Sequence, residues 1–179
     1  MPRPYYEWTN HLRDTLPHFY LGGEKAIIDE TMDAFELLTQ ADNLGSIMKF
    51  KISDTTRNLM QIRVNEWKEQ DTNNEEISEI IKSLELVLIL SDEYASVVAN
   101  PPYMSSNTMN QGLSSYAKKN YPNSKADLFS IFMDVAINLL NCCSKYAMIN
   151  MHSWMFLSSF ESIRKTIITE QKIDSLLHL

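Results

Sequence analysis

The chain has 179 residues, of which 44% are hydrophobic and 22% charged, a composition that supplies one buried core and excludes disordered, collagen-like and disulfide-scaffold proteins. The formal net charge of −7 is unevenly placed, because residues 1–99 hold 9 basic and 18 acidic side chains whereas residues 100–179 hold 7 and 5. A polyanionic partner is therefore compatible with the second part of the chain only, although a solvated acidic helical surface explains the split equally well.

Membrane and metal chemistry are not expected. No apolar run approaches the ~18 residues of a membrane span, and residues 1–10 lack the apolar core of a signal peptide, so we expect a cytoplasmic protein without a membrane partner. Cys142 and Cys143, the only cysteines, are adjacent, a spacing that argues against a disulfide framework and against a zinc site.

The first half is predicted to be helical. Apolar residues recur at helical spacing over residues 24–40, less regularly from Arg57 onward, and again over residues 76–90. A turn near residues 42–45 ends the first helix, and Asp54 to Thr56 are expected to cap the second. We therefore expect a mainly helical, acidic segment over residues 1–92.

The second half alternates strands and helices. Strands are predicted at residues 96–100, 146–151 and 173–179, with helices that begin at Asp127 and at Ser158 between them. Residues 104–123 are expected to form a loop with a helical turn at 113–119. This order predicts a parallel α/β sheet over residues 93–179, whose ligands would lie at the carboxyl ends of the strands.

The segment Asn100-Pro101-Pro102-Tyr103 follows the first of these strands. Consecutive prolines make it stiff and leave its carbonyl groups free to accept hydrogen bonds. The Asn100 side-chain oxygen and the Pro101 carbonyl would accept both hydrogens of an exocyclic amino group, and the Tyr103 ring offers a flat stacking surface. The segment predicts a pocket for an amino-bearing base, with a rigid strand-to-loop turn as the alternative.

Residues 98–103 resemble motif IV of S-adenosylmethionine-dependent adenine-N6 DNA methyltransferases. Asp127 to Phe132 is similar to the start of motif V, Met148 to Trp154 to the motif VI strand, and Phe156 to Lys165 to the helix that follows. The resemblance covers motifs IV to VII, roughly Tyr94 to Ile173. Residues 41–46 and 153–160 further resemble the PglX-type methyltransferase of bacteriophage-exclusion (BREX) defence systems.

The resemblance implies that a flipped-out adenine of double-stranded DNA is the substrate. Its N6 would be held by Asn100 and Pro101 while Tyr103 stacks on the ring. Other BREX-type defence proteins are implied as partners. Lys118, Lys119 and Lys125, in the most basic local region, are candidate phosphate contacts, although a solvated loop is an equal interpretation.

The cofactor implied by the resemblance is S-adenosyl-L-methionine. In relatives the second proline of motif IV and the phenylalanine of motif V line its adenine site, so Pro102 and Phe132 are the matching candidates, with Asp127 as a further one. A core aromatic residue on an amphipathic helix is the alternative for Phe132.

The sequence also departs from the family pattern. The four glycines, Gly22, Gly23, Gly45 and Gly112, do not form the glycine-rich turn of the cofactor site, and residues 141–144 stand where relatives have a Pro-Gly-Gly turn. We expect a partial Rossmann-like methyltransferase sheet, a piece of a larger or split enzyme, with an uncovered strand edge. A non-catalytic methyltransferase-like module that binds DNA or protein is the alternative function.

Overall fold

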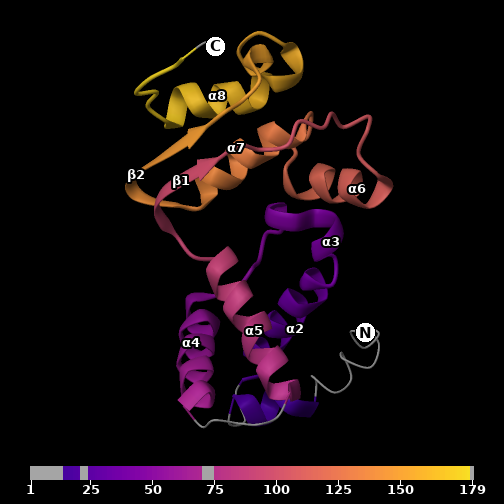
Figure 1. The fold of residues 1–179 in the computed structure, drawn as a ribbon, viewed down its shortest axis with the longest axis vertical. Helices are drawn as coiled ribbons and strands as arrows, with labels where there is room; N and C mark the ends of the chain where they lie inside the picture. Colours follow the sequence, from indigo (N-terminus) through magenta and orange to yellow (C-terminus); the bar gives the residue numbers. More distant parts are fainter. Residues whose placement is uncertain (1–13, 21–23, 70–74, 178–179) are drawn as a thin grey trace. The chain divides into compact units, whose positions relative to one another are not determined.

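The computed structural model describes residues 14–20, 24–69 and 75–177. The chain divides into two compact units, Met1–Asp92 and Glu93–Leu179, which are described separately below (Figure 1).

The first unit is built from helices. Besides a helical turn at residues 14–19, it contains α2 (Lys25–Leu38), α3 (Ala41–Leu44), the 3-10 turn η1 (Gly45–Ile47), α4 (Asp54–Glu69) and α5 (Glu75–Leu90). Helices α4 and α5 pack along each other, and both contact α2. The helices predicted over residues 24–40 and 76–90 are therefore confirmed.

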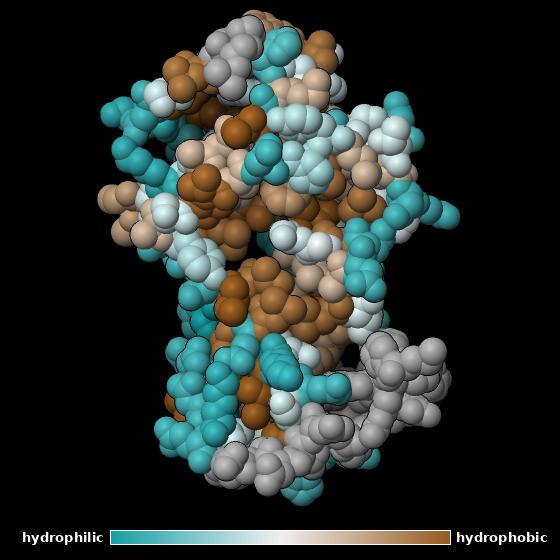
Figure 2. Space-filling view, viewed as in Figure 1, coloured by the Kyte–Doolittle hydropathy of each residue, from teal (hydrophilic) through white to brown (hydrophobic). Residues whose placement is uncertain are grey.

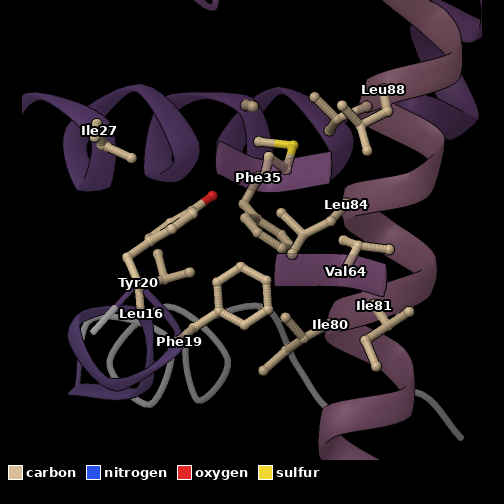
Figure 3. Close-up of a cluster of buried hydrophobic side chains, with 13 residues drawn as sticks. Leu16, Phe19, Tyr20, Ile27, Phe35, Val64, Ile80, Ile81, Leu84 and Leu88 are labelled. Carbon is tan, nitrogen blue, oxygen red and sulfur yellow. The ribbon is translucent and has the colours of Figure 1, made fainter. Parts of the chain in front are cut away.

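A shared apolar core holds these helices together. Phe19 is fully buried, with its ring edge-to-face with Trp67 at 4.6 Å, and Figure 3 shows Phe19 and Phe35 pointing towards Ile80 and Leu84 of α5. Burying side chains of this size contributes about 1.5–3 kcal/mol each, which outweighs the weak intrinsic preference of any single helix.

The cap of α4 differs from the prediction. The helix begins at Asp54, and the residue before it, Ser53, accepts a hydrogen bond at its hydroxyl from the Thr56 amide at 3.3 Å. The Glu30 carboxylate of α2 accepts hydrogen bonds from both the amide and the hydroxyl of Ser53, each at 2.9 Å. The cap therefore also joins α2 to α4, a link between residues distant in sequence.

The second unit contains a parallel pair of strands, β1 (Tyr94–Ala99) and β2 (Leu140–Met148). Ala99 pairs with Met148, and the helix α7 (Leu128–Asn138) that connects the strands packs against β2. The remaining elements are α6 (Gln111–Asn120), the 3-10 turns η2 (His152–Met155) and η3 (Ser158–Phe160), and α8 (Glu161–Glu170). The prediction of a parallel pairing in a mixed helix and strand unit is confirmed.

Two predicted segments differ in the structure. Residues 104–123 are not mainly loop, because α6 forms there with Asn110 as its cap, and the Asn110 side chain accepts a hydrogen bond from the Leu113 amide at 2.9 Å. The strand predicted over residues 173–179 is wrong for the part that is described: residues 171–177 form no strand and pair with neither β1 nor β2.

Strand β2 begins earlier than predicted and contains an irregularity. Tyr94 pairs with Leu140 but Ser96 pairs with Lys145, so residues 141–144 bulge out of the ladder rather than forming a turn before the strand. Within the bulge Cys143 has φ = 65°, the left-handed region that glycine adopts most readily.

Candidate active site

The segment Asn100–Tyr103, called the clamp below, lies at the carboxyl end of β1 beside the end of β2. The last ladder bond runs from the Ile149 amide to the Ala99 carbonyl, at 3.2 Å. In a parallel ladder the next bond would run from the amide of residue 101 to the Ile149 carbonyl, but Pro101 has no N–H. Instead the Tyr103 hydroxyl donates to that carbonyl at 3.0 Å, so the clamp stays attached to β2 through a side chain.

A second attachment follows directly after the clamp. The Met104 amide donates to Asp127 Oδ1 at 3.1 Å, and the Leu128 amide donates to the Met104 carbonyl at 2.9 Å. Ser105 and Asp127 form an isolated antiparallel bridge at the same place. The clamp is therefore tied to β2 on one side and to the start of α7 on the other.

The Tyr103 ring is half exposed and supported from within the unit. Its ring lies 6.0 Å from that of Phe129 at an interplanar angle of 85°, and Phe129 in turn lies 5.2 Å from the ring of Phe160. Phe129 is 1% exposed whereas Tyr103 is 49% exposed. This arrangement fixes the position of the tyrosine while leaving ring surface available to a ligand.

The predicted site residues are distributed as follows. Asn100 and Pro102 are exposed and Pro101 is buried, and Asp127 is brought to the clamp through Met104. Phe132 is partly buried on α7.

The predicted phosphate contacts lie outside the clamp. Lys118 and Lys119 are exposed in the last turn of α6, and Lys125 is exposed in the loop before α7.

Two further residues at this site were missed by the sequence analysis. Phe129 supports Tyr103, but as one of several apolar residues on a strongly apolar helix it carried no distinguishing signal. Asn150 directly follows Ile149, and its Oδ1 is buried without a hydrogen-bond partner within the described part of the chain. Buried polar atoms without partners are uncommon, and where they occur they often mark functional positions.

Residues 14–20, 24–69 and 75–177 contain no group of three or more metal-ligating side chains. Over the same ranges, none of the helices has the length and apolar character needed to cross a membrane.

A polar strand end beside a supported, half-exposed aromatic ring is an arrangement that can accept a planar, hydrogen-bonding ligand. The model of the Eco57I restriction-modification methylase family matches residues 27–179, and the chain belongs to this family. It is 37% identical over 155 residues to the adenine-specific methyltransferase BrxX of Escherichia coli O9:H4 (strain HS), covering 83% of this chain and 12% of that protein. It is 42% identical over 90 residues to the adenine-specific methyltransferase PglX of Lacticaseibacillus casei (strain Zhang), covering 50% of this chain and 7% of that protein.

These similarities confirm the resemblance to adenine methyltransferases of the PglX type that the motifs predicted. The chain nevertheless spans about an eighth or less of the length of these relatives.

Proposed function

We propose that this chain supplies the target-base site of an S-adenosylmethionine-dependent enzyme that methylates N6 of adenine in double-stranded DNA. We further propose that residues 93–179 are part of a Rossmann-like catalytic sheet and that residues 1–92 form a separate helical segment. The enzyme would act in the cytoplasm. Its role would be bacteriophage defence, together with BREX-type partner proteins. The observation that carries the proposal is the clamp itself, held at the carboxyl end of β1 by bonds on both sides.

The clamp would act on the amino group of the flipped base. The exposed Asn100 side chain and the Pro101 carbonyl each present an acceptor, which together match the two hydrogens of an exocyclic amine. Accepting both hydrogens favours a tetrahedral nitrogen whose lone pair points away from the clamp. No strong general base is needed, because the amine becomes acidic once it carries the methyl group.

Other residues fit the remaining requirements. S-adenosylmethionine would supply the electrophilic methyl group, and the exposed Pro102 and partly buried Phe132 offer apolar surface suited to an adenine ring. The half-exposed Tyr103 ring offers a stacking surface for the target base. Lys118, Lys119 and Lys125 are exposed cations suited to DNA phosphates.

The test is replacement of Asn100 by alanine in the protein expressed from its complete gene. We expect the rate of N6-methyladenine formation, measured by mass spectrometry of digested DNA, to fall about 100-fold or more, as when one preorganised hydrogen-bonding group is removed from other active sites. Asn107→Ala, at an exposed asparagine outside the clamp, is the matched control and should retain the normal rate.

Two results would overturn the proposal. Normal methylation by Asn100→Ala would show that the clamp does not hold the reacting amine. Binding of DNA without any methylation by the unaltered protein would favour the non-catalytic module instead.

A further inference from the structure

We propose that Asp127 is a positioning residue that holds the clamp in its reactive shape, rather than a ligand of the cofactor. This inference rests on the proposed function, because it assigns a role in the same target-base site. One carboxylate oxygen of Asp127 accepts hydrogen bonds from two segments of the chain, and the Met104 amide among its donors lies 23 residues away in the sequence.

Asp127 is itself firmly placed. It is the N-cap of α7, and its Oδ1 accepts a hydrogen bond from the Phe129 amide at 3.2 Å. The Ser130 hydroxyl completes a capping box, since it accepts from the Asp127 amide at 3.3 Å. Asp127 is 9% exposed and Ser130 is fully buried. The carboxylate is therefore fixed by the start of the helix before any substrate arrives.

The same oxygen also accepts from the Met104 amide, directly after Tyr103. This second bond matters because the clamp has lost its ladder bond at Pro101 and is tied to β2 through the Tyr103 hydroxyl. The bond between Asp127 and Met104 thus restrains the end of the clamp that the ladder cannot reach.

Positioning of this kind affects the chemical step. Reacting groups must be held within about 0.5 Å of the productive geometry, and a displacement of about 1 Å costs on the order of 100-fold in rate. Loss of the Asp127 carboxylate would free the Met104 amide and leave Met104 held to the start of α7 through its carbonyl, which accepts from the Leu128 amide at 2.9 Å. The residue after Tyr103 would then be restrained less tightly, while Asn100 would still be present.

The experiment compares three variants of the protein expressed from its complete gene: Asp127→Ala, Asp127→Asn and Asn110→Ala. Alanine removes both hydrogen bonds of Asp127, whereas asparagine keeps an oxygen that accepts them. Asn110→Ala removes the N-cap of α6 in the same unit, so it reproduces the loss of a cap at a residue outside the clamp. The measured quantities are kcat for DNA methylation, the Kd of S-adenosylmethionine by calorimetry, and hydrogen exchange of the Met104 amide.

We expect Asp127→Ala to lower kcat by about 10- to 100-fold with an unchanged cofactor Kd, and to expose the Met104 amide to exchange. Asp127→Asn should restore most of kcat and the protection of Met104, and Asn110→Ala should match the unaltered protein in all three measurements. A rise in the cofactor Kd that accounts for the loss in Asp127→Ala would overturn the inference and make Asp127 a cofactor ligand. Equal losses in Asn110→Ala would overturn it in favour of general destabilisation.

Hydrogen exchange separates this inference from the proposed function. If the unaltered protein does not methylate DNA, the proposed function fails, yet the exchange of the Met104 amide still reports whether Asp127 restrains the clamp. An amide that is equally protected in Asp127→Ala would overturn the positioning role whatever the activity.

Discussion

Tyr20 buries its phenol in the core of the first unit, with its hydroxyl 2.9 Å from that of Thr31. Burial raises the pKa of Tyr20 to about 12, an effect that the hydrogen bond to Thr31 partly offsets. Because the unfolded pKa is about 10, the protonated form stabilises the fold fully below pH 10, and this contribution is lost as the pH rises through the folded pKa.

The variant Tyr20→Phe should therefore flatten the alkaline part of the stability profile. At neutral pH we expect it to cost about 1 kcal/mol, since Thr31 keeps its own bond to the Ile27 carbonyl at 2.8 Å. Urea unfolding of both proteins at pH 8 and pH 11 measures the effect. The difference between them should shrink at the higher pH, and a difference independent of pH would show that the Tyr20 phenol titrates normally.

Single residues also show which features of the site can be predicted from the sequence. The clamp was recognisable because Pro101 and Pro102 restrict the backbone locally, wherever the rest of the chain lies. Asp127 was recognisable as a helix start for the same reason. Its bond to Met104 was not, because a hydrogen bond across 23 residues depends on the tertiary fold, which no local pattern contains.

At the level of elements, the strand predictions depended most on context. Residues 173–177 have the apolar residues of a strand but pair with neither β1 nor β2, and their exposed side chains include Ile173 and Leu177. Helix α6 shows the opposite case, because it is a regular element whose apolar pattern is weak. Only Leu113 and Ala117 are buried on it, so the sequence predicted no more than a helical turn there. Its cap at Asn110 supplies much of the local signal. Local periodicity predicts long amphipathic helices more reliably than it predicts short strands or short helices such as α6.

The bulge in β2 gives a prediction at this level. A non-glycine residue in the left-handed region costs roughly 1–2 kcal/mol, and Cys143 occupies that region with φ = 65°. Cys143→Gly should relieve this cost, and after the greater chain entropy of glycine is subtracted we expect a gain of about 0.5 kcal/mol in the free energy of unfolding. Cys142→Gly, at the exposed neighbour outside that region, should lower stability by a similar amount. Thermal unfolding that moves in the same direction in both variants would contradict the bulge conformation.

At the level of the whole molecule, apolar side chains reach the surface beside hydrophilic ones in both units (Figure 2). In the second unit, Val98 of β1 is 81% exposed, Ile149 is 58% exposed and Phe156 is 73% exposed. Within the described residues the sheet consists of β1 and β2, so each strand has an edge that pairs with no other strand. Open edges beside exposed apolar side chains favour association between molecules.

We therefore expect residues 1–179, prepared alone, to self-associate. Val98 and its partner Ala147 lie on the exposed face of the sheet, where a charge opposes pairing without disturbing the core, so Val98→Lys should shift the chain towards monomer. Ile62→Lys, at a residue of α4 that is 52% exposed, introduces the same charge in the other unit and should leave association unchanged. Sedimentation velocity over a range of concentrations measures all three proteins. A monodisperse monomer for the unaltered chain would show that the edges of β1 and β2 do not pair between molecules. Equal effects of Val98→Lys and Ile62→Lys would attribute association to net charge rather than to the sheet.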